Sequence, residues 1–288
     1  MPKKKAVKNK SVKAVRKSPP KKPLVSINVP TYNSEKTLAL TLEAAKRQTY
    51  DNVEILLIDS YSSDRTLEIA KKFGCKIVMC KGGLLEARVR GAEESKGDFV
   101  LFLDSDQILH QETIAKCVEA IKEHDCLWLY ERAYNRHKWI PSLYDADRLL
   151  VQKHLEEDVV LPRFFKKDLL LKAMKNIPPE IYDVCKAHDH LILRNEFFRV
   201  SKNMGRVGDL SMPAVEHIEP SNLPNLIKKQ YRWGRTTRDF YEKGFYKGTI
   251  KSRNSFRKIH PNDLRWSLKS LILRVLRGIP YKFGYWFG

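Results

Sequence analysis

The chain has 288 residues, 42% of them hydrophobic, and its 54 Lys and Arg against 34 Asp and Glu give a formal net charge of +20. This length and apolar content exclude a disordered chain and a small disulfide-stapled domain, and they predict one large α/β domain or two small ones. The chain has no stretch of about 18 uncharged apolar residues, so we expect no membrane span. Its five cysteines form no Cys-x-x-Cys pair and follow no secretory signal, so we expect a cytosolic protein with reduced thiols.

The positive charge lies at the two ends of the chain. Residues 1–22 carry ten Lys or Arg and no acid, residues 220–288 carry +13, and residues 23–219 therefore carry −3. The first segment repels itself and has nothing apolar to bury, so a disordered basic tail is predicted over 1–22. A nearly neutral body is not typical of a nucleic-acid-binding protein, so we expect no specific nucleic-acid partner; binding of nucleic acid through the tail is the non-enzyme alternative.

Apolar runs alternate with segments of 3.6-residue period through the first 130 residues. Strands are predicted over Leu24–Val29, Val53–Ile58, Lys76–Met79, Phe99–Leu103 and Cys126–Tyr130. Helices are predicted after Ser34 as N-cap, and over Asp64–Phe73, Leu84–Glu94 and Glu112–Lys122. This alternation predicts an α/β fold with a mostly parallel central sheet and helices on both faces. Ligands of such sheets bind at the carboxyl ends of the strands.

Acidic residues stand at two of these strand ends. Asp59 ends the second predicted strand, and Asp104-Ser105-Asp106 follows the fourth. Two carboxylates one residue apart reach a single hard cation, Mg²⁺ or Mn²⁺, which commonly shares its remaining positions with substrate phosphates. No Gly-x-Gly-x-x-Gly or P-loop motif is present, which disfavours a dinucleotide fold and a P-loop enzyme. The pattern predicts a nucleotide-diphosphate site with a divalent metal and no glycine-rich cradle.

Three segments in fixed order, VPTYNSEKTL, LLIDSYSSDRT and GLLEARVRGAEESKGDFVLFLDSDQ, resemble the family 2 glycosyltransferases, which have the GT-A fold. The resemblance covers residues 23–200 and continues more weakly to about 245. It implies a GT-A domain over 23–245, with a nucleotide-sugar half at about 23–130 and an acceptor half at about 131–245. It also implies inverting transfer of a hexose from a UDP- or GDP-linked sugar to an acceptor hydroxyl. Sugar-phosphate nucleotidylyltransferases have a similar sheet, but PTYNSE is not their glycine-rich basic turn.

The resemblance implies nucleotide contacts for four residues near the first two strands. Pro30, Tyr32 and Glu35 match the turn that packs on the nucleotide, and Asp59 matches the carboxylate that accepts a hydrogen bond from the uracil or guanine ring. Many members have a second acid after this carboxylate, where this chain has Ser60, so the nucleotide stays open. For Glu35 the alternative is a plain preference for a helix N-terminus.

The same resemblance implies a metal and diphosphate site. Arg88 matches a residue near the ribose and diphosphate, with pairing to a surface acid such as Glu94 as the alternative. Asp104, Ser105 and Asp106 match the metal motif; Asp104 and Ser105 also face the nucleotide sugar, and Asp106 is favoured as the direct ligand.

In the acceptor half, Asp189 matches the general base of the inverting members. Such a base must reach the acceptor hydroxyl on the face opposite the leaving diphosphate. His188 replaces the usual acid before it and His190 follows; a His-Asp-His metal site is the alternative, disfavoured because adjacent side chains diverge on a helix. A phosphate acceptor is already ionised and needs the base less, so a polyprenyl-phosphate (dolichyl-phosphate) sugar synthase is the alternative within the class.

Two further segments carry candidate ligands. His217 lies where some related enzymes complete the metal shell with a histidine, a structural role being the alternative; imidazole suits manganese better than magnesium. Gln230-x-Arg232-Trp233 is one residue short of the Gln-x-x-Arg-Trp segment of processive synthases. Arg232, Trp233 and Arg235 are candidates near the diphosphate or an anionic acceptor, with a solvated basic helix face as the alternative.

The last segment, 246–288, is basic and amphipathic. From Leu264 onward apolar residues recur at helical spacing among Arg and Lys, and an aromatic cluster follows Pro280. This pattern predicts a helical C-terminal extension that lies in the surface of an anionic membrane, with a helix packed on the protein's own core as the alternative. We expect the acceptor to be a lipid-linked glycan, a glycolipid or a polyprenyl phosphate. With such an acceptor, the amphipathic segment predicts a peripheral protein on the cytoplasmic membrane face.

Overall fold

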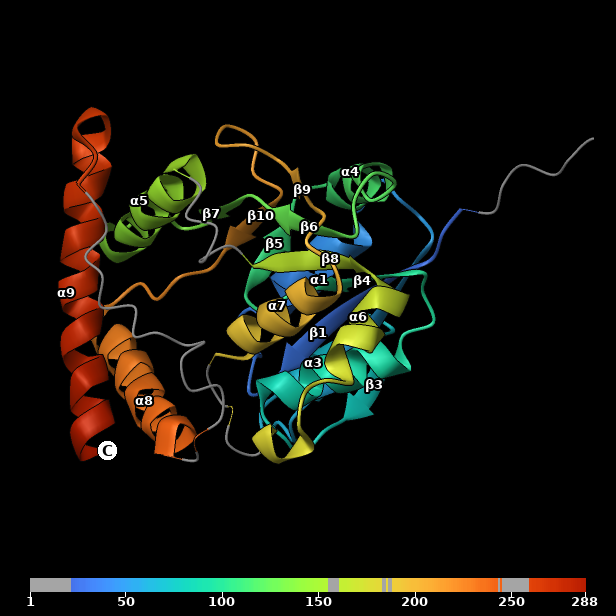
Figure 1. The fold of residues 1–288 in the computed structure, drawn as a ribbon, viewed down its shortest axis with the longest axis horizontal. Coiled ribbons are helices and arrows are strands. Elements are labelled where there is room, and N and C mark those ends of the chain that lie inside the picture. The colour runs from blue at the N-terminus through green and yellow to red at the C-terminus, as the bar shows by residue number, and fades with distance from the viewer. Residues whose placement is uncertain (1–21, 155–160, 183–184, 186–187, 243, 245–258) are drawn as a thin grey trace, which may run out of the picture.

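A computed structural model of the chain describes residues 22–154, 161–182, 185, 188–242, 244 and 259–288 (Figure 1). The predicted basic tail therefore lies outside the described residues up to residue 21, and so do residues 246–258 of the predicted C-terminal segment. All five cysteines are described, and they are free thiols.

A seven-stranded sheet in the order β3-β2-β1-β4-β8-β6-β9 forms the centre of the fold. Its strands are β1 (Val25–Thr31), β2 (Val53–Asp59), β3 (Lys76–Met79), β4 (Phe99–Phe102), β6 (Cys126–Leu129), β8 (Pro162–Lys166) and β9 (Met204–Val207). Strand β1 pairs in parallel with β2 and β4, β2 with β3, and β6 with β9, whereas β8 runs antiparallel to β4 and β6. The predicted mostly parallel sheet is confirmed.

Helices cover both faces of this sheet, as predicted. One face carries α1 (Leu38–Lys46), α2 (Thr66–Lys72) and α4 (Thr113–Ala120), and the other carries α3 (Leu84–Glu94), α6 (Lys167–Met174) and α7 (Asp189–Val200). Because successive strand side chains point to opposite faces, Leu101 packs in the first core while Val100 and Phe102 pack in the second. The two cores, one on each face of the sheet, make this the predicted α/β architecture.

A small second sheet stands beside the carboxyl end of β4. It contains β5 (Gln107–Leu109), β10 (Val215–His217) and β7 (Glu131–Ala133) in the order β5-β10-β7. The antiparallel register of β10 with β5 sets His217 opposite Gln107, and the amide of Ile218 donates to the carbonyl of Asp106 at 2.8 Å. This sheet therefore brings His217 to the acidic pair.

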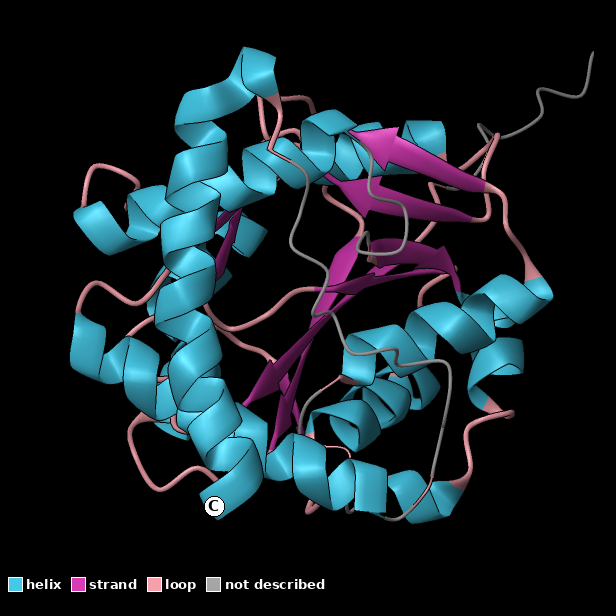
Figure 2. Cartoon of the chain, turned by 60° about the vertical axis from the view of Figure 1, so that its left-hand side comes forward, coloured by secondary structure: helices cyan, strands magenta, loops and turns pink. Residues whose placement is uncertain are grey.

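Three long helices form a layer at one side of the sheet, at the left of Figure 1 and in front in Figure 2. They are α5 (Trp139–His154), α8 (Leu223–Glu242) and α9 (Leu264–Phe287), and short 3₁₀ turns, η2 (Pro179–Ile181) and η3 (Pro261–Asp263), precede α7 and α9. The predicted C-terminal helix is confirmed, and it continues through Pro280. None of the helices in the described part of the chain combines the length and apolar content needed to cross a bilayer.

Glycines set the distance between α8 and α9. A Cβ atom on Gly234 would overlap the carbonyl oxygen of Tyr281, and one on Gly284 would overlap the carbonyl oxygen of Tyr231. The two backbones therefore approach as closely as only glycine permits.

The predicted N-cap of the first helix is wrong. Helix α1 begins at Leu38 with Thr37 as N-cap, because residues 35–37 first form a turn. Ser34 instead accepts hydrogen bonds from the Thr37 and Leu38 amides with its carbonyl oxygen, and its hydroxyl lies 2.9 Å from that of Ser105. The Ser34 side chain thus joins the turn after β1 to the acidic segment after β4.

Candidate active site

A cleft of about 2350 Å³ opens at the carboxyl ends of β1 and β4, between the sheet and the layer of α8 and α9. All but two of the residues predicted for the site line it: Pro30, Tyr32, Arg88, Asp104, Ser105, Asp106, Asp189, His217, Arg232, Trp233 and Arg235. The volume exceeds the roughly 300–1,000 Å³ of a typical small-molecule pocket, so it has room for two substrates. The other two predicted residues, Glu35 and Asp59, do not line the cleft.

Asp59 is fully buried behind the cleft. Its carboxylate accepts hydrogen bonds from the amide of Ser62 at 2.8 Å, from the hydroxyl of Ser62 at 2.6 Å and from the hydroxyl of Thr31 at 2.9 Å. Asp59 therefore fixes the turn after β2 against the end of β1, and its contact with a nucleotide base stays a prediction. Glu35 accepts from the backbone amide and Nε of Arg65, both at 3.3 Å, at the start of α2.

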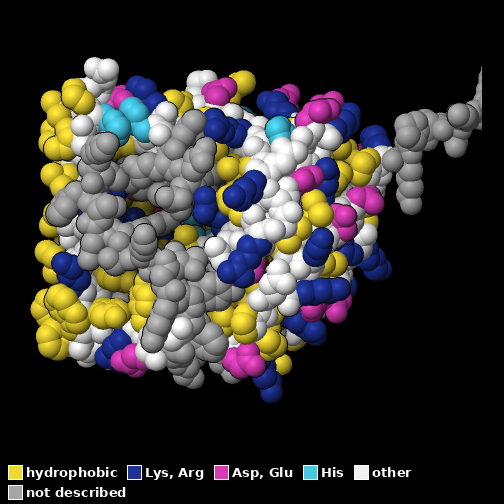
Figure 3. All heavy atoms as spheres, viewed as in Figure 1, with side chains coloured by type: hydrophobic (Ala, Val, Ile, Leu, Met, Phe, Trp, Pro, Cys, Tyr) yellow, Lys and Arg dark blue, Asp and Glu magenta, His cyan; other side chains and the backbone are white. Residues whose placement is uncertain are grey.

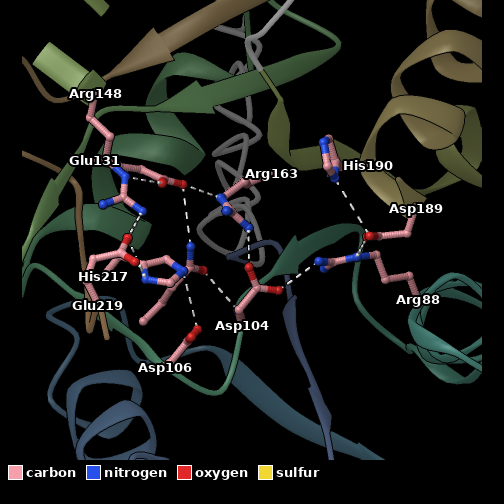
Figure 4. A network of polar contacts seen from close by, with 11 residues as sticks. Arg88, Asp104, Asp106, Glu131, Arg148, Arg163, Asp189, His190, His217 and Glu219 are labelled. Carbon is pink, nitrogen blue, oxygen red and sulfur yellow. Dashed lines mark hydrogen bonds and ion pairs between the residues drawn. The ribbon is translucent and has the colours of Figure 1, made fainter. Parts of the chain in front are cut away.

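Arg88 connects the two parts of the cleft (Figure 4). Its guanidinium is buried; Nη2 donates to Asp104 at 2.7 Å and Nε donates to Asp189 at 2.7 Å. The alternative pairing with Glu94 does not occur, because Glu94 contacts Lys76 at 2.9 Å. Nη1 of Arg88 is buried and has no hydrogen-bond partner among the described residues, which is unusual for a buried donor and suits a ligand oxygen.

A chain of ion pairs that the sequence analysis did not predict continues from Asp104 (Figure 4). Arg163 on β8 contacts Asp104 at 3.2 Å and Glu131 on β7 at 2.5 Å. Arg148 on α5 contacts Glu131 at 3.5 Å and also Glu219. These four residues belong to no short motif; the one signal for them is Arg163 itself, a charged residue in the apolar run PRFF, since a buried Arg requires a partner.

The surrounding guanidinium groups keep the buried acids ionised. Burial alone would raise the pKa of Asp104, but Arg88 and Arg163 hold it well below its usual range. Burial likewise opposes ionisation of Asp189, whose pKa Arg88 and then His190 lower. Against its burial, Arg148 and His217 lower the pKa of Glu219 to about 2. The cleft therefore presents fixed negative and positive charges side by side.

Asp104, Asp106 and His217 form a candidate metal centre. Each offers one ligand atom, and these atoms lie within 4.8 Å of one another. Nε2 of His217 lies 3.4 Å from Asp106, and Nδ1 lies 3.3 Å from Glu219 without forming a hydrogen bond. Two carboxylates and one imidazole are a donor set that suits a divalent cation, and Glu219 is placed to orient the imidazole from behind. The residues therefore fit the predicted metal.

Asp189 begins α7 and faces the cleft from the side opposite Asp106. His188 before it has φ 71°, in the left-handed region, and its Nε2 lies 2.9 Å from the hydroxyl of Thr237 on α8. Nδ1 of His190 lies 3.7 Å from the Asp189 carboxylate. Among the residues that the structure describes, the His-Asp-His run forms no metal-ligand group, whereas Asp104, Asp106 and His217 do.

Comparison with known proteins gives consistent results. The glycosyl transferase family 2 profile matches residues 26–176. The chain is 27% identical over 147 residues to the uncharacterized glycosyltransferase EpsJ of Bacillus subtilis, which is 48% of this chain and 43% of EpsJ. The chain spans about half the length of the curated relatives it matches.

Solved structures share the fold. Staphylococcus aureus TarS in complex with UDP-GlcNAc superposes with a TM-score of 0.52 at 17% identity, covering 91% of this chain and 90% of that one. The Pyrobaculum calidifontis mannosyltransferase PcManGT in complex with GDP-Man and Mn²⁺ superposes with a TM-score of 0.52 at 15% identity, covering 92% and 74%.

Proposed function

Because the chain belongs to glycosyl transferase family 2, we propose that it moves a hexose from a UDP- or GDP-linked sugar to an acceptor hydroxyl, with inversion at the anomeric carbon and with a divalent metal. The observation that carries the proposal is the meeting of Asp104, Asp106, His217, Arg88 and Asp189 in one cleft. It unites candidate ligands for a metal, a cation for a diphosphate and a base for an acceptor. That solved relatives hold UDP-GlcNAc, or GDP-Man with Mn²⁺, supports this class of donor and cofactor.

Each group has a distinct task on the donor side. Asp104, Asp106 and His217 would hold the cation, Mg²⁺ or Mn²⁺, whose charge offsets that of the leaving diphosphate. Arg88 and Arg163 add fixed positive charge at the same place, and preorganised charge of this kind is a large term in catalysis. Pro30, Tyr32 and Ser105, at the same end of the cleft, are proposed to contact the nucleotide sugar.

On the acceptor side, Asp189 is proposed to take the proton of the hydroxyl as it attacks. Arg88 fixes the carboxylate through Nε, so Asp189 cannot rotate away from the cleft. The buried ion pair also keeps it ionised, as a base must be, although the same lowering of its pKa makes Asp189 a weaker proton acceptor than a free carboxylate.

The acceptor is proposed to be lipid-linked. Arg232, Trp233 and Arg235 on α8 and Arg277 and Lys282 on α9 line the outer wall of the cleft. A basic wall suits an anionic head group, and for the same reason it favours a polyprenyl-phosphate acceptor as the second candidate. In that case the phosphate oxygen is already ionised, and transfer should depend less on Asp189.

A screen of UDP- and GDP-sugars with Mn²⁺ by thermal shift and turnover tests the proposal. A donor at 100 times its Kd should stabilise the protein by about 2.7 kcal/mol, and it should be consumed when acceptor is present. Asp106→Asn should remove the metal-dependent part of both signals. If no nucleotide sugar shifts the melting temperature of the folded protein and none is consumed, the proposal fails.

A further inference from the structure

Helix α9 has two chemically different faces. Ser267, Ser270, Leu273 and Gly284 are buried, and the opposite side of the helix is exposed and mostly apolar, with Lys282 in line with the apolar side chains. The exposed residues, here named the α9 stripe, are Leu264, Leu268, Leu271, Ile272, Val275, Ile279, Phe283 and Trp286. Each is between 37% and 61% exposed. The helix therefore packs on the protein along one face, which was the predicted alternative, and its other face is an apolar stripe that the described residues leave uncovered. Contact of this segment with a membrane stays a prediction.

The α9 stripe is long and narrow. At 1.5 Å per residue it extends about 33 Å, and at 3.6 residues per turn its members fall within an arc of about 120°. Apolar side chains line the edge of the molecule over α9 at the left of Figure 3. Soluble surfaces rarely expose contiguous apolar patches of this extent without a partner. A stripe of this length favours a partner surface that it meets lengthwise.

A small basic pocket flanks the stripe. A cavity of about 310 Å³ between α5 and α9 is lined by Arg132, Arg136, Arg265, Lys269 and Trp266, among others. Two of its cations are engaged by acids, because Asp145 holds Arg132 and Glu216 holds Arg136.

The two cations that α9 contributes to this pocket differ from the other pair. Within the described ranges, Lys269 donates one hydrogen bond, to the hydroxyl of Ser142 at 3.2 Å. In the described part of the chain neither Arg265 nor Lys269 has a carboxylate within ion-pair distance. Because they are one helical turn apart, they present two unneutralised charges at one edge of the stripe.

We propose that the α9 stripe docks on an anionic phospholipid bilayer and that a lipid phosphate binds beside it, at Arg265 and Lys269. The charge argues for lipid over a second copy of this chain: a twin surface would bring like charges together on a chain of net charge +20, whereas anionic lipids attract them. A helix with an apolar face flanked by Arg and Lys is the form in which proteins bind in the plane of such a surface.

This docking deepens the proposed function. Its link to catalysis rests on the proposal that the acceptor is lipid-linked. Val275, Ile279 and Trp286 belong to the stripe and also line the cleft. The docked protein would therefore hold the mouth of the cleft at the lipid surface, where a membrane-bound acceptor enters. Docking itself requires neither donor nor metal.

Sedimentation of the full chain with vesicles of phosphatidylcholine, with or without the anionic lipid phosphatidylglycerol, tests the inference without donor or metal. The wild type should sediment with the anionic vesicles and stay in the supernatant with the neutral ones. Ile272→Glu with Val275→Glu should remove binding, and Arg265→Glu with Lys269→Glu should weaken it at least about tenfold, since each basic group contributes about 1 kcal/mol near the surface. Point variants are preferred to deletion of α9, which would uncover α5 and α8.

Two controls isolate the site. Lys71→Glu with Lys72→Glu, on exposed positions of α2, makes the same change in net charge, and Leu40→Glu adds a charge to an exposed apolar position of α1. Both should bind like the wild type.

The proposal is overturned if the wild type stays in solution, or if the controls lose binding as strongly as the α9 variants. It is also overturned if the wild type binds no vesicles and instead forms a dimer through the stripe, which Ile272→Glu separates. Turnover of a nucleotide sugar by the same samples, with a water-soluble acceptor, reports on the transferase function alone. A wild type that turns over the nucleotide sugar but does not bind the vesicles therefore counts against the docking face only.

Discussion

Asp189 accepts a hydrogen bond of 2.7 Å from Nε of Arg88, which lies 101 positions earlier in the chain. The same guanidinium donates to Asp104 through Nη2, so one buried cation holds a proposed metal ligand and the proposed base at once. Donor and acceptor halves of the cleft thus share a single fixed group. Two consequences can be measured, one in stability and one in its pH dependence.

Arg88→Met should destabilise the protein strongly, because it leaves two buried carboxylates without their shared partner. Loss of one member of a buried ion pair costs about 3–5 kcal/mol. Arg90→Met is the matched control: Arg90 lies on the same helix, its side chain is 49% exposed, and its ion pair among the described residues is with Glu93 at 3.5 Å. Its loss should change the free energy of unfolding by less than about 0.5 kcal/mol. Urea denaturation at pH 7 compares them, and equal effects would contradict a structural role of the pair.

The destabilisation caused by Arg88→Met should become smaller as the pH falls. In the wild type the pKa of Asp104 and of Asp189 is lower in the folded than in the unfolded state. The two carboxylates therefore stabilise the folded protein above their unfolded-state pKa of about 3.9, and this stabilisation is lost as the pH falls below it. Arg88→Met removes the largest influence that lowers the pKa of each carboxyl and leaves burial, which raises it, so both pKa values rise in the variant. The variant therefore regains stability relative to the wild type as these carboxyls become protonated at falling pH.

The gap in free energy of unfolding between wild type and Arg88→Met should therefore narrow from pH 7 to pH 4, measured by urea denaturation at several pH values. Arg90→Met provides the baseline for general acid effects. A gap that stays constant over this range would show that the two carboxylates do not sense Arg88.

Metal binding should depend on Asp106. Asp106→Asn keeps the shape of the side chain but removes one negative ligand, so affinity for Mn²⁺ should fall by at least the roughly 10–100-fold seen for weaker changes around metal sites. Asp51→Asn, at an exposed acid that contacts Lys22, is the control and should bind Mn²⁺ like the wild type. Electron paramagnetic resonance of free Mn²⁺ measures both; unchanged affinity in Asp106→Asn would remove this residue from the site.

The nucleotide half of the fold was predictable because long buried strands and amphipathic helices leave strong periodic patterns. β1, β2 and β4 lie within two residues of their predicted bounds, and the acids at their ends follow from the chain order. The three-residue strands β5 and β10 are too short for any period, although they bring His217 to Asp106. The partners of Arg163 were not predictable, since β7 and β8 meet only in the folded protein.

Asp189→Asn should abolish transfer and preserve donor binding. The amide keeps an oxygen for Arg88 but cannot take a proton, and loss of a general base typically costs about 10²–10⁴-fold. Asp239→Asn changes another carboxylate that lines the same cleft and should leave kcat nearly unchanged. Single-turnover transfer and donor titration separate the two steps. Full transfer by Asp189→Asn would place the base elsewhere, with His190 as the first residue to change; a small loss would favour a phosphate acceptor.

Replacing glycine by alanine should change the free energy of unfolding in opposite directions at two positions of α9, because one of them contacts α8 and the other does not. Gly284→Ala places a methyl group on the carbonyl oxygen of Tyr231, so the helices must separate and the free energy of unfolding should fall by about 1–3 kcal/mol. At Gly278 a Cβ meets nothing within 4 Å, so Gly278→Ala should raise it by up to about 1 kcal/mol through helix propensity alone. Thermal and urea denaturation followed by circular dichroism measure both. Because helix propensity favours Ala at either position, a stabilising Gly284→Ala would mean that the backbones of α8 and α9 are not in contact there.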